Sequence, residues 1–186
     1  KRSTDGATAL AAAIFGGHLD MALELVKDYE GVDVNKADNS GLTPLMYAAQ
    51  KGDVRLVELL LHKGAKIKSV DGDNWTALHH AVSTGHVECA RSLLAEDAPV
   101  DIQDRAGQTA LHVAVYMDRV DCFRLLLDHG AKTNIIDAEG YAAMGYAEGA
   151  EHETEFHTLV TMHMEQGSKE PEERDGLLEA SLDKLV

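Results

Sequence analysis

Apolar residues recur along this chain in short helical patterns that turn residues separate. Two of the longer patterns are Val54, Leu56, Val57, Leu59, Leu60 and Leu61, and Val120, Phe123, Leu125, Leu126 and Leu127. Each holds too many apolar positions for a single stripe, which is typical of a helix that neighbours cover on two sides. A shorter apolar run precedes each one and predicts a first helix of about two turns, for example over 44–50. We therefore expect pairs of short helices that cannot bury their apolar faces alone.

The pairs repeat at a nearly constant step. The tripeptides Thr8-Ala9-Leu10, Thr43-Pro44-Leu45, Thr76-Ala77-Leu78 and Thr109-Ala110-Leu111 recur at steps of 35, 33 and 33 residues, and a degenerate copy, Ala142-Ala143-Met144, follows after another 33. Turns with Asp first and Gly or Asn fourth precede the later copies, at 38–41, 71–74, 104–107 and 137–140. The spacing predicts a repeat array over 3–165, divided at 3–37, 38–70, 71–103, 104–136 and 137–165. An acidic tail with a short amphipathic segment follows at 166–186.

Cap and turn residues support the same division. Thr43 and its equivalents suit the N-cap of a first helix, and Pro44 suits the first helical position, where a missing N–H donor costs nothing. Gly17, Gly52 and Gly85 then provide the positive φ that reverses the chain. Asp97 and Asp118 stand where glycine is expected, and aspartate tolerates left-handed geometry better than most residues.

The combination of turn, Thr-x-Leu-His, short helix, Gly and Leu-rich helix resembles the ankyrin repeat, most closely at 74–79 and 107–112. The resemblance implies an all-α solenoid of about five helix-turn-helix repeats joined by β-turn or hairpin loops. The last repeat departs from the pattern, since Gly145 replaces the usual His and Glu148, Gly149 and Glu151 make its first helix polar, which suits a terminal cap. The first repeat has no such polar helix, so we expect an upstream repeat or a partner to cover 7–15.

The resemblance also implies that a partner binds on a concave face, made of the turn tips and the exposed sides of the first helices. The candidate partner-binding residues on that face are Leu42, Lys51, Trp75, Arg105, Gln108, Tyr116, Met117 and Tyr141. Exposed Trp, Tyr, Met and Arg match the composition of binding hot spots. For Trp75 the alternative is sideways packing on the neighbouring turn, and Leu42 is alternatively a lone apolar residue on the surface.

Charge narrows the class of partner. The chain carries 17 Lys and Arg against 32 Asp and Glu, a formal net charge of −15. Because this charge repels phosphate backbones, we expect no nucleic-acid partner, and a protein with a basic or amphipathic segment is favoured. The alternative is that the charge serves only solubility. An apolar run of about 18 residues, as a membrane span requires, is missing. Cys89 and Cys122 suit reduced packing positions, so we expect an intracellular protein, of cytosol or nucleus.

Sequence motifs for catalysis are missing, so we expect a protein that is not an enzyme and uses no cofactor. The resemblance implies that His79 and His112 tie adjacent turns by hydrogen bonds. His80 and His86 lack further ligands at zinc spacing, and we expect no metal site. Asn134 lies in a segment that resembles the family's asparagine hydroxylation site, and its alternative role is to stabilise a turn.

Two functions and several roles of the tail stay open at this stage. The first function is a non-catalytic protein-interaction scaffold, and the second is a regulatory or targeting domain of a larger enzyme or signalling protein, which the initial Lys1 favours. The segment 176–186 places Leu178, Leu182 and Leu185 on one side of a short helix. It is a candidate intramolecular ligand that packs on the array or occupies its groove, and the alternative is that it begins a coiled coil.

Overall fold

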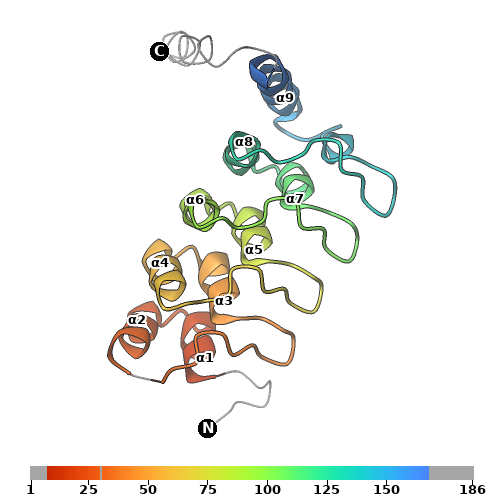
Figure 1. The fold of residues 1–186 in the computed structure, drawn as a ribbon. Helices are drawn as coiled ribbons and strands as arrows, with labels where there is room; N and C mark the ends of the chain where they lie inside the picture. Colours follow the sequence, from red (N-terminus) through yellow and green to blue (C-terminus); the bar gives the residue numbers. More distant parts are fainter. Residues whose placement is uncertain (1–7, 30, 168–186) are drawn as a thin grey trace, which may run out of the picture.

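The computed structural model describes residues 8–29 and 31–167, and within them the helices lie in two rows (Figure 1). The first-helix row contains α1 (Ala9–Phe15), α3 (Pro44–Lys51), α5 (Ala77–Ser83), α7 (Ala110–Tyr116) and the 3₁₀ turn η1 (Ala143–Tyr146). The second-helix row contains α2 (Leu19–Asp28), α4 (Val54–His62), α6 (Val87–Ala95), α8 (Val120–Asp128) and α9 (Glu153–Gly167). The predicted all-α repeat solenoid is confirmed. Ala7 and the predicted ligand segment 176–186 lie outside the described residues.

The ends of the helices are set by the residues that the sequence marks. Thr43 Oγ1 accepts a hydrogen bond from the backbone N–H of Met46 at 3.3 Å, and Pro44 begins α3. Gly52 ends the same helix with φ 75°, in the left-handed region that favours glycine. Asp97 and Asp118 take φ values of 58° and 55°, so both substitutions of glycine keep the left-handed turn.

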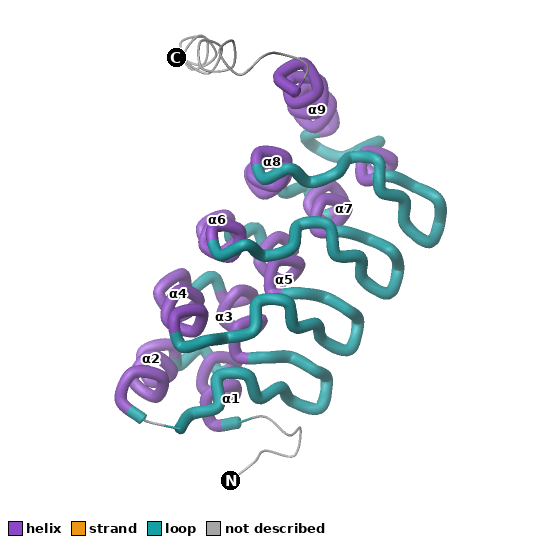
Figure 2. The backbone as a smooth tube through the Cα atoms, viewed as in Figure 1, coloured by secondary structure: helices purple, strands orange, loops and turns teal. Residues whose placement is uncertain are grey.

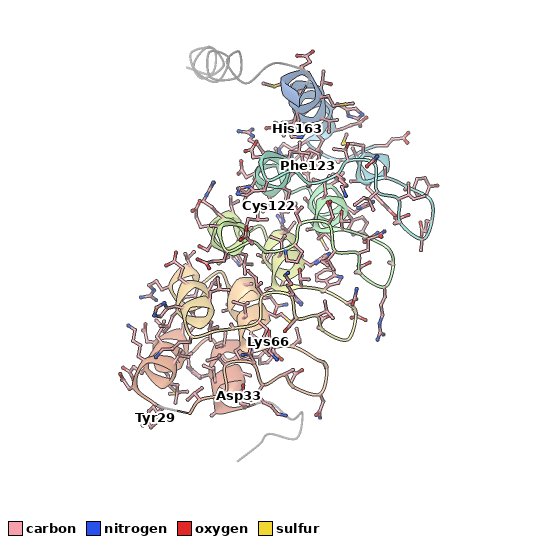
Figure 3. The ribbon with its side chains drawn as sticks, in the orientation of Figure 1. Tyr29, Asp33, Lys66, Cys122, Phe123 and His163 are labelled. Carbon is pink, nitrogen blue, oxygen red and sulfur yellow. The ribbon has the colours of Figure 1, made fainter. Side chains whose placement is uncertain are left out.

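The core runs without interruption along the array because each inner repeat packs its helices on those of the repeats before and after it. Fully buried alanines, among them Ala48, Ala81 and Ala114, let the first helices approach closely. At the C-terminal boundary the rings of Phe123 and Phe156 are both fully buried and meet at 5.0 Å between centroids. Figure 3 shows Phe123 beside Cys122 on α8. No unit could bury these surfaces alone, as the apolar pattern predicts.

Long loops extend from the first-helix side in a row, one above the next (Figure 2). Backbone hydrogen bonds join neighbouring tips: Gly72 donates to the carbonyl of Ser40 at 2.7 Å, Arg105 to Asp73 at 3.0 Å, and Ala138 to Ala106 at 2.9 Å. Within the described ranges the loops form no strand, and the single isolated bridge joins Ile136 and Ala142. The tip bonds fix the register of the loops, so side chains on them are held in place.

The last repeat has a weak first helix, as its polar residues predict. Only the four-residue turn η1 forms there, and α9 follows with 15 residues. Phe156 is the side chain of α9 that enters the core. Among the described helices, none is both long and apolar enough to cross a membrane.

Candidate functional site

An aspartate opens each turn of the concave face and uses its two carboxylate oxygens differently. Asp71 Oδ1 accepts the backbone N–H groups of Asp73 and Trp75, both at 2.9 Å, and so closes the turn. Its Oδ2 lies 2.9 Å from Nε2 of His80, which stands nine residues later on α5. Asp38 and Asp137 hold the hydroxyls of Tyr47 and Tyr146 at the same nine-residue spacing. Each of these turns is therefore bonded to the first helix that follows it.

Asp104 is the exception, because the residue nine positions after it is Val113, which has no donor. The indole Nε1 of Trp75, in the preceding repeat, donates to Asp104 Oδ2 at 2.9 Å instead. The Trp75 ring is half-buried, stacked on His79 with a centroid distance of 5.9 Å and edge-on to His80 at 5.3 Å. These contacts support the packing alternative for Trp75, in which its ring joins two adjacent repeats.

The histidines of the Thr-x-Leu-His positions are buried and structural. Nδ1 of His112 accepts the N–H of Thr109 at 3.2 Å, and its Nε2 lies 3.3 Å from the carbonyl of Tyr141 in the next turn, as the resemblance implies. Nε2 of His79 is buried near the backbone of Gln108 but outside hydrogen-bond geometry among the described residues. Burial lowers the pKa of His79 to about 4, so its ring is neutral at pH 7.

Three tyrosine rings form the most exposed aromatic group of the concave face. Tyr116 is 65% exposed and Tyr141 53% exposed, and the ring of Tyr146 contacts both, with centroids 6.0 and 5.9 Å away. Gln108 Nε2 donates to the Tyr146 hydroxyl at 3.4 Å. We call Tyr116, Tyr141 and Tyr146 the tyrosine cluster. Through its contacts with Tyr146, the cluster brings together two of the predicted partner-binding residues, Tyr116 and Tyr141, and a third, Gln108, is bonded to it.

Tyr146, the ring that contacts both others in this cluster, is not among the residues predicted from the sequence. A signal for it exists in the chain, since Tyr146 follows Asp137 by nine residues, as Tyr47 follows Asp38. That spacing places a first-helix side chain against the turn, on the concave face. A comparison of this position across the repeats would have identified it.

The remaining predicted residues are spread over the same face. Met117 follows Tyr116 directly and is 39% exposed, so it extends the tyrosine cluster. Arg105 is exposed at a turn tip. Leu42 is half-buried against the core, and Lys51 places its Nζ over the ring of Phe15. Leu42 and Lys51 belong to the second repeat, which puts them roughly 20 to 30 Å from the tyrosine cluster of the fourth and fifth repeats at about 10 Å per repeat.

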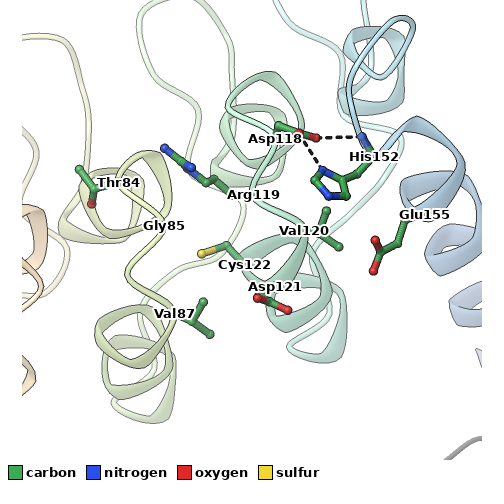
Figure 4. Close-up of a pocket in the computed structure, with 10 residues that line it drawn as sticks. All are labelled: Thr84, Gly85, Val87, Asp118, Arg119, Val120, Asp121, Cys122, His152 and Glu155. Atoms are coloured by element: carbon green, nitrogen blue, oxygen red, sulfur yellow. Dashed lines mark hydrogen bonds and ion pairs between the residues drawn. The ribbon is translucent and has the colours of Figure 1, made fainter. Parts of the chain in front are cut away.

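Away from the tyrosine cluster, polar side chains gather in a pocket at the turns between first and second helices. Asp118, Arg119, His152 and Glu155 are among the residues that line this pocket (Figure 4). Nδ1 of His152 lies 2.7 Å from Oδ2 of Asp118, and this hydrogen bond raises the pKa of His152. The ligand atoms of Asp118, Glu151 and His152 lie within 4.8 Å of one another, close enough to hold a metal ion. The hydrogen bond between Asp118 and His152 accounts for the positions of these two side chains.

The two cysteines offer no nucleophile to such a pocket. Cys89 and Cys122 are both free and buried, and burial raises the pKa of each thiol to about 11. A thiol with so high a pKa is almost wholly protonated at pH 7 and is therefore a weak nucleophile. Both side chains serve as packing residues, as the sequence analysis predicts.

Comparison with known protein families agrees with the repeat geometry. A family model described as ankyrin repeats (3 copies) matches residues 1–71 and again residues 65–137. The two matches together span 1–137, which is more than half of the 186 residues. Ankyrin repeats generally mediate protein–protein interaction, and domains built from them are typically non-catalytic.

Proposed function

The chain belongs to the ankyrin repeat family, and we propose that it binds another protein through the concave face of its array. The observation that carries the proposal is the exposure of Tyr116 and Tyr141, at 65% and 53%, on a face whose loops are fixed by tip-to-tip hydrogen bonds. Exposed tyrosines on a rigid surface contribute large contact areas at a small entropic cost. The partner would therefore be anchored at the C-terminal half of the concave face.

The fold itself does not require these side chains to be aromatic. Tyr116 ends α7 at the position that Gln50 and Ser83 occupy in the two preceding repeats, and both of those residues are polar. Tyr141 likewise precedes a first helix at the position of Leu42 and Gln108. Because the same scaffold positions accept side chains that are not aromatic, the tyrosines serve the surface rather than the core.

We assign Met117, Gln108 and Arg105 to the edge of the same contact. Met117 adds an adaptable apolar side chain next to Tyr116, and Arg105 adds an exposed charge at a turn tip. Trp75 acts differently in this account, since its indole N–H is already bonded to Asp104. Its role is to hold the turn that presents Gln108.

The charge of the chain favours a partner with basic groups. A net charge of −15 attracts a cationic surface over distances comparable with the Debye length, about 8 Å at physiological salt. This attraction raises the association rate more than it raises affinity. Binding is therefore expected to be faster at low than at high ionic strength.

The proposal is tested by affinity capture from cell lysate with three baits of equal thermal stability, analysed by mass spectrometry. The baits are the wild-type array, the double variant Tyr116→Ser/Tyr141→Ser, and a control, Met21→Ser/Tyr29→Ser. Tyr29 is a matched control because it is also 65% exposed but lies at the end of α2, in the second-helix row (Figure 3). Proteins that the control retains and the Tyr116/Tyr141 variant loses support the proposal. Proteins that both variants retain contradict it.

A further inference from the structure

One arrangement of side chains occurs twice in the array, at its first and at its last repeat boundary. In each case an aromatic residue ends a first helix and contacts a tyrosine in the first helix of the next repeat. An aspartate nine residues before that tyrosine accepts a hydrogen bond from the tyrosine hydroxyl. The first set consists of Phe15, Tyr47 and Asp38, and the second set consists of Tyr116, Tyr146 and Asp137. Both sets lie on the concave face.

The two ring pairs have nearly the same geometry. Phe15 and Tyr47 meet edge to face, with 5.7 Å between centroids and 71° between ring planes. Tyr116 and Tyr146 meet at 6.0 Å and 87°. The second set has one more ring, since Tyr141 also contacts Tyr146, at 5.9 Å and 63°. Two exposed rings therefore contact the ring of Tyr146.

The first set contains a cation that comes from the chain itself. Nζ of Lys51, four residues after Tyr47, lies over the ring of Phe15 at 5.4 Å from its centroid. Four residues after Tyr146 the chain has Ala150. Across residues 8–29 and 31–167, Lys51 over Phe15 is the one cation found over an aromatic ring. The nearest cation in sequence to Tyr116 is Arg119, whose guanidinium is directed to the carbonyl of Ser83.

The electrostatic surroundings of the second set favour a positive charge. Asp137 and Glu139 both raise the pKa of the Tyr146 hydroxyl, the first mainly by its hydrogen bond and the second by its charge. Faces of tyrosine rings attract cations within about 6 Å of the centroid. The second set thus offers a cation the same kind of contact that Phe15 gives Lys51 in the first set, with three rings and two nearby carboxylates. Within the described residues, no lysine of the chain occupies that place.

We propose that the tyrosine cluster binds the cationic side chain of a lysine or arginine on the partner protein. The side chain takes the place over Tyr116 that Lys51 takes over Phe15. This inference rests on the proposed function, and it names the chemical group that the concave face recognises. It also gives the basic character of the partner a specific point of contact.

The test uses short peptides as probes and the rings of ¹³C-tyrosine-labelled array as reporters. The peptides are acetyl-Gly-Ser-X-Ser-Gly-amide, where X is lysine, arginine or norleucine, which has a lysine-like length without the charge. Chemical-shift titration of the Tyr116 and Tyr141 rings gives a dissociation constant for each peptide. We expect the lysine or the arginine peptide to bind at least about threefold more tightly than the norleucine peptide.

A double variant separates the ring faces from apolar bulk. In Tyr116→Leu/Tyr141→Leu, where apolar contact stays but the ring faces are lost, the preference for the cationic peptide should disappear.

Equal binding of all three peptides by the wild type would overturn the inference, and so would a cation preference that persists in Tyr116→Leu/Tyr141→Leu. The outcome is separable from that of the capture experiment. If the Tyr116/Tyr141 bait loses its partners while the peptides bind alike, the concave face remains the binding face and only the cation assignment is wrong. If that bait keeps its partners, the proposed function itself fails.

Discussion

The indole N–H of Trp75 reaches Oδ2 of Asp104, 29 residues further along the chain, at 2.9 Å. The other three turn aspartates take their donor from their own repeat, nine residues later. At Asp104 this position is Val113, and Trp75 replaces the missing donor from the preceding repeat. The hydrogen bond therefore couples two repeats at a position where the local one is lost.

Trp75→Phe tests this coupling, because phenylalanine keeps an aromatic ring over His79 and His80 but removes the N–H donor. We expect the free energy of unfolding to fall by about 1–2 kcal/mol, the cost of leaving a half-buried carboxylate oxygen without its partner. Urea unfolding followed by circular dichroism measures the change. Trp75→Leu, which also loses the ring stacking, should cost more. A Trp75→Phe variant as stable as the wild type would show that the bond carries no net energy.

Gly52 tests the contact between consecutive turns. Its φ is 75°, and a Cβ placed there would lie 2.6 Å from the imidazole ring of His86 in the next repeat. Gly64 is the matched control, with φ 84° and no atom within 4 Å of an added Cβ. Gly64→Ala should cost about 1–2 kcal/mol from backbone strain alone, and Gly52→Ala clearly more.

A second substitution makes the Gly52 prediction specific to His86. In the background Gly52→Ala, the further change His86→Ala removes the ring that the new methyl group would meet. Urea unfolding of both variants and of His86→Ala alone gives the coupling between the two positions. The double variant should recover part of the stability that Gly52→Ala loses. Strictly additive losses would contradict a close contact between this turn and the His86 ring.

The buried ring of His79 makes stability depend on pH. Its pKa is lowered from 6.5 to about 4 in the folded protein, mainly by burial, so the unfolded chain binds a proton at a higher pH than the folded chain does. The contribution of neutral His79 to the free energy of unfolding is present in full above pH 6.5. It is lost as the pH falls from 6.5 towards 4. Between pH 7 and pH 5 this histidine alone should lower the free energy of unfolding by about 2 kcal/mol.

His79→Met is the control for this pH dependence, since Met46 occupies the same position in the preceding repeat and accepts the Thr43 N–H through its sulfur at 3.4 Å. The variant keeps an acceptor for Thr76 but cannot titrate. Urea unfolding at pH 7 and pH 5 should give a smaller decrease for His79→Met than for the wild type. An equal decrease in both would assign the pH dependence to other groups, such as His80, whose pKa burial also lowers.

Phe156 tests how α9 is attached to the array. Its ring is fully buried against Phe123, and truncation to alanine should cost about 3–5 kcal/mol. Because terminal repeats contact a neighbour on one side only, we expect α9 to lose protection before the central repeats do. Hydrogen exchange of Phe156→Ala should therefore show faster exchange in α9 and near-native exchange in α5 and α6. A uniform increase over the whole array would contradict this local attachment.

The sequence predicted the phase of the repeats, because caps and turns are local: Thr43, Pro44 and Gly52 each have a strong conformational preference that neighbours need not supply. Left-handed Asp97 and Asp118 were predictable for the same reason. The hydrogen-bond donors that pair with the turn aspartates were harder to predict from the sequence. The nine-residue spacing could have indicated Tyr146, but the use of Trp75 by Asp104 depends on a side chain that crosses from one repeat to the next.

The exposed surface was predicted only in outline. Counting positions from each Thr placed Gln108, Tyr116 and Tyr141 on one face, and the structure joins them through Tyr146. The same counting could not separate Tyr116, whose ring is 65% exposed, from Trp75, which is half-buried. The difference arises because Asp104 lacks a side-chain donor in its own repeat and accepts the indole N–H of Trp75, which draws the Trp75 ring inward.

The most direct test of the central claim is site-specific photo-crosslinking of the array in cell lysate. A benzophenone-bearing phenylalanine replaces Tyr116 on the concave face in one protein and Tyr29, at the end of α2, in another; the two side chains are equally exposed in the wild type. We expect position 116 to crosslink a discrete protein that excess unlabelled wild-type array competes away, and position 29 to crosslink none. Crosslinking of that protein from position 29 and not from position 116 would contradict binding at the concave face.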